Sequence, residues 1–237
     1  MKLSAPIFRL KRQAKLLARE TNTPLHQALD QISRREGYQS WSHLAGSNSD
    51  HRPAKRVFEE LASGDLVLLG GRPGHGKTLL GLELAVEAVR AGRRSFFFTL
   101  EENKAAVLDR LRVLGADEKA IQNSLIIDTS DDICANYIAD RVRDGCTDSV
   151  VVIDYLQILD QKRSNPELAV QLEELGSLAR DVPSIVVAMS QIDRSFDFKS
   201  KRLPELSDVR LPNPVNLALF TKTCFMHEGE VLLEAVS

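Results

Sequence analysis

The sequence of 237 residues contains no apolar run that approaches the ~20 residues a membrane-spanning helix needs. Its N-terminus is basic, but it lacks the apolar core and the small-residue cleavage site of a secretory signal. These absences argue against a membrane protein and against an exported one. We therefore expect a cytoplasmic protein that works without a membrane.

Cysteine patterns typical of metal sites and disulfide frameworks are also missing. The three cysteines, Cys134, Cys146 and Cys224, are scattered, odd in number and form no CxxC pair. This arrangement predicts reduced cysteines in a cytosolic protein. Hydrophobic residues make up 43% of the chain and charged residues 27%, which is typical of a globular protein.

The small net charge of −2 conceals an asymmetry along the chain. Residues 1–56 hold eleven Lys and Arg against four Asp and Glu, a balance of +7, so that the remainder carries −9. A basic segment on an acidic body suggests either a polyanionic partner or contact with the acidic surface of a neighbouring subunit. An ordinary solvated helix face is an equally open interpretation.

Residues 1–46 are predicted to form a small helical domain. Apolar residues fall at helical spacing over 6–20 and 24–36, and Tyr38, Trp41 and Leu44 are expected to close a small core over the two helices. A helix-turn-helix reader is compatible with this pattern, but no clear recognition helix is present. An oligomerisation or docking arm is at least as compatible. Residues 47–53 have the composition of a linker.

Residues 54–237 alternate between helical and buried-strand patterns. This predicts an α/β fold with a mostly parallel, twisted sheet and helices on both faces. The expected helices are 54–62, 78–91, 102–114, 131–144 and 166–180, and the expected strands are 66–69, 95–100, 125–127, 149–154 and 184–189. A polar segment over 192–214 precedes two strands near 217–225 and 230–235, which we expect to form an antiparallel hairpin at the sheet edge.

A glycine-rich loop lies between the strand at 66–69 and the helix that follows it. It fits the pattern G-x-x-x-x-G-K-[ST], whose backbone N–H groups and following helix favour a phosphate. The lysine is expected to reach the β- and γ-phosphates, and the threonine hydroxyl to bind Mg²⁺. The nucleotide-binding residues are therefore predicted to be Gly71, Arg72, Pro73, Gly74, His75, Gly76, Lys77 and Thr78.

Polar residues follow three further strands of the predicted sheet. Because ligands of such sheets sit beyond the carboxyl ends of the strands, we expect these residues to converge on the phosphates. Asp154 is predicted to hold the water shell of Mg²⁺, Gln191 to sense the γ-phosphate, and a glutamate to activate water. ATP and Mg²⁺ are the expected cofactors.

Two adjacent glutamates compete for the role of general base. Glu101 lies at the strand end and is our choice, while Glu102 is interpreted as a first-turn acid of the next helix. His75 is interpreted as a variable loop position and not as a catalytic histidine.

Four segments, taken together, resemble the RecA-like ATPase domain of DnaB-type replicative helicases. They are GGRPGHGKTLLGLELA, FFFTLEENKAAVLDRL, VVIDYLQIL and VVAMSQIDRS, and KRLPELSDVR resembles the stretch that follows them. The resemblance covers about residues 55–225 and implies a RecA-like fold, ATP hydrolysis with Mg²⁺, and ring hexamers around DNA. It also implies phosphate and Mg²⁺ contacts for Lys77 and Thr78, the base role for Glu101, and the metal and sensor roles for Asp154 and Gln191.

The chain departs from this family at several points. The loop SDLRESG of the family reads SDVRLPN here, which keeps Arg210 but not the acid and glycine after it. No counterpart of the family's Lys-x-Arg finger is found, and residues 1–46 do not resemble its N-terminal domain. ATP binding is expected to survive these departures better than processive unwinding. The pair Glu101-Glu102 also resembles the KaiC and RadA branch.

The segment 192–214 is the predicted contact for single-stranded DNA. Basic side chains track phosphates and aromatic rings stack on bases, and here Phe196 and Phe198 are interleaved among the basic residues. A solvated loop whose aromatics are tucked into an interface is the alternative. The predicted nucleic-acid residues are Arg194, Lys199, Lys201, Arg202 and Arg210.

Two functions of different classes follow from the sequence. The first is a DnaB-like ATPase on single-stranded DNA, assembled as a homo-oligomeric ring, with unwinding left open. The second is a KaiC-like or accessory ATP-binding switch that controls assembly without unwinding. An adaptor that binds DNA through residues 1–46 is a third interpretation.

Overall fold

The structure is a computed structural model that describes residues 3–5, 7–41, 43–44, 53–144, 148–193, 196, 203–210, 215–227 and 230–236. The chain divides into two compact units, Met1–Arg52 and Pro53–Ser237. Among the described helices, none combines the length and the apolar character needed to cross a bilayer.

The first unit is built on two helices, α1 (Ile7–Glu20) and α2 (Leu25–Arg35), each within a residue of its predicted bounds. Gly37, at φ 85°, follows α2 in the left-handed region that ends helices. The N–H of Trp41 donates to Asp30 Oδ1 at 2.8 Å, which ties the segment after α2 to that helix. The core of this unit consists of Leu10, Ala14, Ala28, Ile32, Tyr38 and Leu44.

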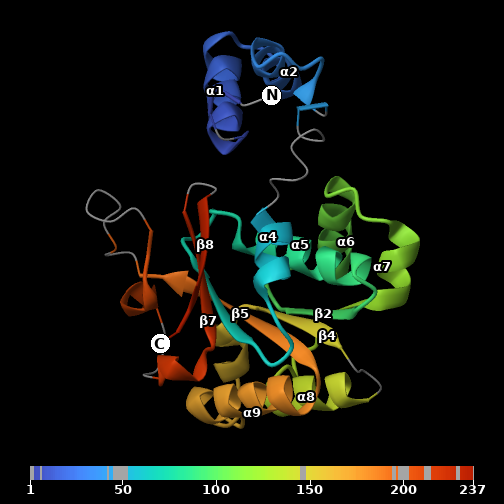
Figure 1. The fold of residues 1–237 in the computed structure, drawn as a ribbon, viewed down its shortest axis with the longest axis vertical. Coiled ribbons are helices and arrows are strands. Elements are labelled where there is room, and N and C mark those ends of the chain that lie inside the picture. The colour runs from blue at the N-terminus through green and yellow to red at the C-terminus, as the bar shows by residue number, and fades with distance from the viewer. Residues whose placement is uncertain are drawn as a thin grey trace. The chain divides into compact units, whose positions relative to one another are not determined.

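The second unit contains one eight-stranded sheet within its described residues (Figure 1). Seven strands run in the order β3-β2-β4-β5-β1-β7-β8, and β6 pairs with β5. All neighbours pair in parallel except β5 with β6 and β7 with β8. The strands are β1 (Leu66–Gly71), β2 (Arg94–Thr99), β3 (Leu125–Asp128), β4 (Ser149–Asp154), β5 (Ser184–Ile192), β6 (Val209–Arg210), β7 (Lys222–His227) and β8 (Glu230–Ala235).

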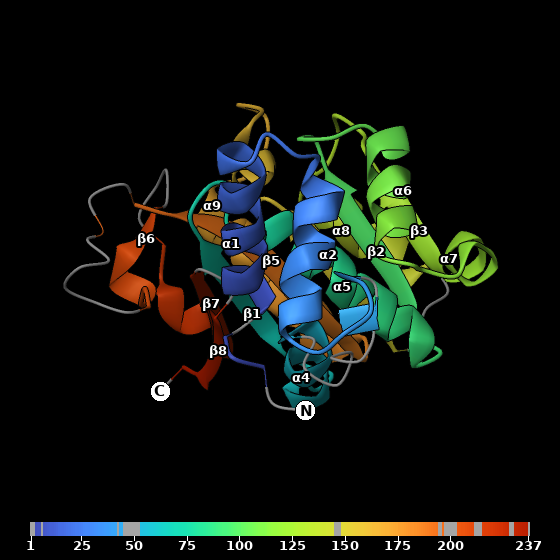
Figure 2. The same ribbon diagram turned by 90° about the horizontal axis from the view of Figure 1, so that it is seen from above.

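Helices cover both faces of this sheet, as predicted (Figure 1). The first face is covered by α4 (Pro53–Glu60), α5 (Lys77–Arg90), α6 (Lys104–Val113) and α7 (Glu118–Ser124). The second face is covered by α8 (Ala135–Arg143) and α9 (Leu168–Asp181). Seen from above, α6 and α7 lie together near β3 (Figure 2).

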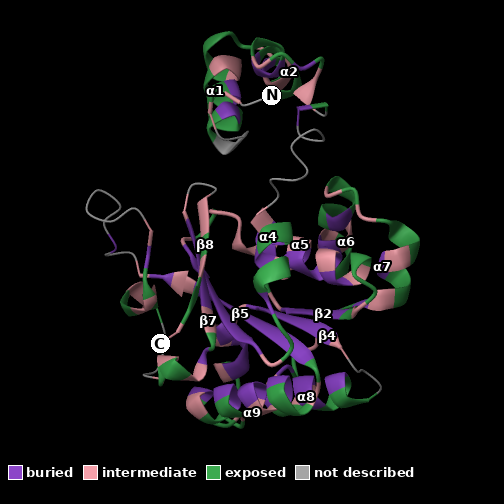
Figure 3. Ribbon diagram, in the orientation of Figure 1, coloured by how far each residue is buried: buried purple, intermediate pink, exposed green. Residues whose placement is uncertain are grey.

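The central strands β4 and β5 carry continuous apolar runs, as is typical of strands whose two faces are both covered. Successive residues alternate between two cores: Val150 and Val152 of β4 pack beneath α5, whereas Val151 and Ile153 pack against the α8 and α9 face. Figure 3 shows these strands buried between helices whose outer faces are exposed. The predicted α/β class with a mostly parallel sheet and an antiparallel hairpin is confirmed.

Several predicted bounds were wrong for local reasons. The helix expected at 102–114 begins at Lys104, because Asn103 caps it by accepting from the N–H of Ala106 at 2.9 Å. Helix α7, with Asp117 as its cap, was not predicted at all. The strand expected near 217–225 instead begins at Lys222, after a 3₁₀ turn over Leu217–Leu219.

The described residues of the polar segment 192–214 include regular elements that the sequence did not predict. Strand β5 extends to Ile192, a 3₁₀ turn spans Leu206–Asp208, and β6 returns antiparallel to β5. This return brings Arg210 opposite Gln191, near the end of β5.

Candidate nucleotide-binding site

The glycine-rich loop joins the carboxyl end of β1 to the first turn of α5. Gly74 and Gly76 have φ values of 77° and 95°, which side-chain-bearing residues rarely adopt. Gly76 is also the residue that caps α5, so the loop leads directly into the positive end of the helix. The fold thus provides the strand, loop and helix setting that a phosphate cradle requires.

Lys77 is directed back into this loop. Its Nζ donates to the carbonyl oxygens of Gly71 at 2.8 Å and Arg72 at 3.2 Å. Burial lowers the pKa of Lys77, and the charges of Asp154 and Glu101 act in the opposite direction. The two carboxylates predicted from separate strands are therefore electrostatic neighbours of this ammonium group.

Asp154 ends β4 with only 4% of its surface exposed. Burial raises the pKa of Asp154 to about 6, and the hydrogen bond from the Thr78 hydroxyl opposes the rise. The second carboxylate oxygen, Oδ2, is buried without a hydrogen-bond partner. A buried oxygen of this kind is costly unless a donor or a cation satisfies it.

The donor chemistry at Thr78 and Asp154 fits Mg²⁺. This ion prefers oxygen ligands and is usually held by one or two carboxylates, waters and substrate phosphates. Among the described residues, no group of three or more His, Cys, Asp or Glu side chains gathers to hold a metal. The remaining ligands of an ion at this position would thus come from the nucleotide and from water.

The structure separates the two adjacent glutamates. Glu102 was predicted to open the next helix, but it lies before α6, which begins at Lys104. Its carboxylate forms an ion pair with Arg110 through two hydrogen bonds, one of them from Arg110 Nε to Oε2 at 2.6 Å. The Glu101 carboxylate instead faces the Tyr155 hydroxyl and contributes to the field at Lys77. The Glu101 N–H donates to Thr99 Oγ1 at 3.1 Å, which fixes its backbone at the end of β2.

Gln191 lies in the same row of the sheet as Gly71, the first residue of the glycine-rich loop. It pairs with Gly71 of β1 on one side and with Arg210 of β6 on the other. It alternates in phase with Val187 and Met189, which pack beneath α5, so its side chain is on the face that carries the glycine-rich loop.

Tyr155 and Gln157 are contacts that the sequence interpretation left without roles. Burial and the charge of Glu101 raise the pKa of Tyr155, whose hydroxyl hydrogen-bonds that carboxylate. Gln157 donates from Nε2 to the carbonyl oxygen of Arg210 at 3.3 Å. Both follow Asp154 within the quoted segment VVIDYLQIL, so their position in that segment was the available signal.

Of the five predicted nucleic-acid residues, the structure describes only Arg210. Arg194, Lys199, Lys201 and Arg202 lie outside the described residues. Phe196 is buried with Ile192 and Phe225, and its carbonyl accepts from Arg72 Nη2 at 2.7 Å. The expectation that Phe196 stacks on bases was therefore wrong, because its ring belongs to a small apolar cluster.

His75 of the loop stacks on His227, with ring centroids 5.2 Å apart and planes inclined by 28°.

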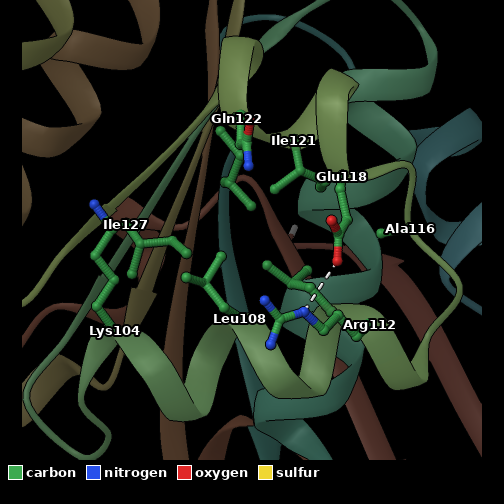
Figure 4. A pocket seen from close by; sticks show the side chains of 10 residues that line it. Lys104, Leu108, Arg112, Ala116, Glu118, Ile121, Gln122 and Ile127 are labelled. Atoms are coloured by element: carbon green, nitrogen blue, oxygen red, sulfur yellow. Dashed lines mark hydrogen bonds and ion pairs between the residues drawn. The ribbon is translucent and has the colours of Figure 1, made fainter.

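A separate apolar pocket of about 200 Å³ lies between α6, α7 and β3 (Figure 4). Leu108 and Ile127 point into it, and the Arg112–Glu118 ion pair lies across its rim. None of the predicted nucleotide-binding residues lines this pocket.

Comparison with known proteins identifies relatives of this arrangement. Residues 111–214 match the DnaB-like helicase C terminal domain, a range that includes Asp154, Gln191 and Arg210 but not the glycine-rich loop. A probable plasmid replicative DNA helicase of Chlamydia muridarum is 26% identical over 182 residues, which is 63% of this chain and 40% of that protein. The replicative DNA helicase DnaB of Synechocystis is 26% identical over 183 residues, 63% of this chain and 21% of that protein. The chain thus spans well under half the length of these curated relatives.

Solved structures show the same fold. A DnaB-like replicative helicase, solved with its interactions with primase, superposes with a TM-score of 0.60 at 20% identity, over 92% of this chain and 66% of that one. A KaiC-like protein of Pyrococcus horikoshii superposes with a TM-score of 0.51 at 17% identity, over 70% of this chain and 75% of that one. The fold of this chain is RecA-like, and residues 111–214 are similar to the C-terminal domain of DnaB-like helicases.

Proposed function

We propose that this protein is a Mg²⁺-dependent ATPase that acts on single-stranded DNA as part of a homo-oligomer. The observation that carries the proposal is the buried, unpartnered Oδ2 of Asp154 beside the Thr78 hydroxyl and within the field of Lys77. A bound Mg²⁺ would neutralise phosphate charge and orient the terminal phosphate. The residues around it supply the remaining requirements of hydrolysis.

Each residue has a distinct part in the proposed reaction. The loop N–H groups and Lys77 hold the phosphates, and Glu101 accepts a proton from the attacking water. The water oxygen forms a bond to the γ-phosphorus as the bond to the β,γ-bridging oxygen breaks. Tyr155 orients the Glu101 carboxylate, and Gln191, in the row of Gly71, is suited to respond to the γ-phosphate.

The DNA-related part of the proposal is supported by the family match and by the relatives, which are replicative helicases. The contact is proposed for the basic segment 192–214, and a ring hexamer is the proposed assembly. A KaiC-like switch, in which nucleotide controls assembly without strand movement, is the second candidate, and the fold shared with a KaiC-like protein favours keeping it.

The decisive measurement is the rate of ATP hydrolysis by the full chain with Mg²⁺, with and without single-stranded DNA. We expect hydrolysis that DNA stimulates, and formation of a larger assembly with nucleotide. Binding of ATP without any effect of DNA would favour the switch. Lys77→Ala should abolish ATP binding in both cases, so tight binding by this variant would contradict the phosphate site itself.

A further inference from the structure

The side chain of Gln157 connects the segment after β4 to the two-residue strand β6. Gln157 lies in a 3₁₀ turn, Leu156–Asp160, that follows the end of β4. Its sequence neighbours Leu156 and Ile158 are buried in the core on the α8 and α9 face, so the backbone of Gln157 is fixed. From this position, Gln157 Nε2 donates to the carbonyl oxygen of Arg210 at 3.3 Å.

The same carbonyl oxygen accepts a second hydrogen bond from β5. Ser190, which is buried in that strand, donates to it from Oγ at 3.2 Å. The next residue of β5, Gln191, is the strand partner of Arg210. The main chain of Arg210 is therefore held both by β5 and by the segment after β4.

The guanidinium of Arg210, in contrast to its main chain, is available to a ligand. Arg210 is exposed, and none of the described carboxylates forms an ion pair with it. Its charge reaches Tyr155, where it opposes the rise in pKa that burial and the charge of Glu101 cause. An exposed arginine on a fixed backbone is suited to a phosphate, because a guanidinium can donate two parallel hydrogen bonds to phosphate oxygens.

An amide at position 157 is a poor choice for stability alone. Gln157 Oε1 is buried and has no hydrogen-bond partner. A buried polar atom without a partner costs free energy, and an apolar side chain of similar size would avoid that cost. Departures of this kind from the most stable choice are typical of functional sites. The hydrogen bond from Nε2 to Arg210 is the contact that distinguishes the amide from such an apolar side chain.

We propose that Gln157 is a positioning residue for DNA binding, which together with Ser190 holds Arg210 so that its guanidinium meets a backbone phosphate of single-stranded DNA. The inference rests on the proposed function, in which Arg210 belongs to the DNA contact. It goes further because it ties that contact to the ends of β4 and β5, where Asp154 and Gln191 belong to the candidate nucleotide site. Gln157 itself touches no phosphate and acts through Arg210.

The test is a double-mutant cycle in the full chain, in which the affinity for a labelled oligothymidylate is measured over a range of salt concentrations. Arg210→Gln should weaken binding at least about tenfold, because it removes a hydrogen bond between charged groups. It should also make the slope of log affinity against log salt shallower by about 0.7, the value for one phosphate contact of a single strand. Gln157→Leu should weaken binding about three- to tenfold and make the slope shallower as well, although it changes no charge.

The variant that carries both substitutions should bind DNA as weakly as Arg210→Gln alone, because Gln157 acts through Arg210. Gln161→Leu is the matched control: Gln161 is an exposed glutamine at the end of the same turn, and its loss should change DNA affinity by less than about twofold. The urea midpoint of Gln157→Leu should equal or exceed that of the wild type.

Three results would overturn the inference: an unchanged DNA affinity of Gln157→Leu, losses that multiply in the double variant, or a loss of affinity that accompanies a fall in the urea midpoint. The last result would make Gln157 a structural residue. If Arg210→Gln binds DNA as the wild type does, or the wild type binds none, the proposed DNA contact itself is wrong and the inference falls with it.

Discussion

Glu101 and Glu102 are adjacent residues of the same type, but they lie in different electrostatic surroundings. Glu102 is paired with Arg110 of α6, so its charge is already balanced within the fold. Glu101 is exposed at the end of β2 and contributes to the field at Lys77 and Tyr155. The geometry therefore favours Glu101 as the residue that can meet a water molecule at the phosphates.

Glu101→Gln should lower the rate of ATP hydrolysis by about 10²- to 10⁴-fold, the usual contribution of a general base, and leave ATP binding nearly unchanged. Glu102→Gln is the matched control, because it removes the same charge one residue away. It should keep hydrolysis and cost at most about 1 kcal/mol of stability, since Arg110 is half-exposed. Steady-state kinetics and urea unfolding of both variants check the prediction, and similar hydrolysis rates for the two would refute it.

Asp154 is the second residue whose surroundings predict a separable effect. Asp154→Asn keeps the size of the side chain but replaces one carboxylate oxygen beside Thr78 by an amide group. We expect the concentration of Mg²⁺ needed for half-maximal hydrolysis to rise at least about tenfold, because the ion loses a charged ligand. Titration of activity with Mg²⁺ measures this effect. An unchanged Mg²⁺ requirement would remove Asp154 from the metal site.

Sequence patterns grouped these residues because each lies at or just after the carboxyl end of a buried strand. A parallel sheet brings such ends together, so the loop after β1 with Lys77, and Asp154 and Gln191 at the ends of β4 and β5, were predictable as one site. The partners of the two glutamates were not predictable from the sequence. Tyr155 contacts Glu101 and Arg110 contacts Glu102 through side-chain packing that leaves no periodic pattern in the sequence. The row position of Arg210 was equally hidden, since a two-residue strand is too short to produce an alternating pattern.

Among the elements, the joint between β1 and β7 is stabilised by a buried carboxylate. Asp65 precedes β1 and accepts hydrogen bonds from Lys222 Nζ, Thr221 Oγ1 and the Ala62 N–H, each at 2.8 Å. Lys222 opens β7 and also donates to the Glu60 carbonyl of α4 at 2.7 Å. Asp65 thus joins β1, β7 and the end of α4 at the amino ends of the strands, whereas the candidate nucleotide site lies at their carboxyl ends.

The pH dependence of stability should report this joint. Burial pushes the pKa of Asp65 upward, but the hydrogen bonds from Lys222, Ala62 and Thr221 outweigh it, and the pKa lies below its ordinary value. The stabilisation is then complete above the unfolded-state pKa of about 4 and is lost as the pH falls through the lower folded-state pKa. Asp65→Asn should therefore lower stability by about 1–2 kcal/mol at pH 7 and lose less on acidification than the wild type.

Urea unfolding at pH 7 and at mildly acidic pH values measures the difference. Asp109→Asn is the control, because Asp109 is a largely exposed carboxylate at a surface ion pair with Arg112. It should reproduce the wild-type stability to within about 0.5 kcal/mol at pH 7. If Asp65→Asn loses stability on acidification as steeply as the wild type, the carboxylate does not anchor β7.

Elements were predictable where they are long and periodic. The central strands and α5 and α9 are within a few residues of their expected bounds, because buried runs and helical stripes identify them. Helix α7 is only seven residues long and its apolar stripe reduces to Ile121, so no pattern marked it. The start of β7 was misplaced because Leu217 and Leu219 read as strand residues, whereas they pack beside the α9 face from a 3₁₀ turn.

At the scale of the whole molecule, the chain combines two units with cores of their own. The core of Met1–Arg52 is drawn from α1, α2 and the segment after them, whereas the cores of Pro53–Ser237 on the two faces of the sheet begin at Ala54 and Leu66. The charge asymmetry largely follows this division, since the first unit holds nine Lys and Arg against four Asp and Glu, a balance of +5. Two partners fit that charge, DNA or the acidic surface of a neighbouring subunit.

Removal of residues 1–52 separates these possibilities. The fragment 53–237 should unfold cooperatively and bind ATP within about twofold of the full chain, because it retains the entire sheet and every predicted nucleotide-binding residue. If the segment 192–214 is the DNA contact, the fragment also keeps DNA-stimulated hydrolysis, and its DNA affinity falls with rising salt. Loss of DNA binding with ATP binding intact would instead assign the contact to the basic first unit. Failure to form the nucleotide-dependent assembly, with DNA binding intact, would make that unit an oligomerisation arm.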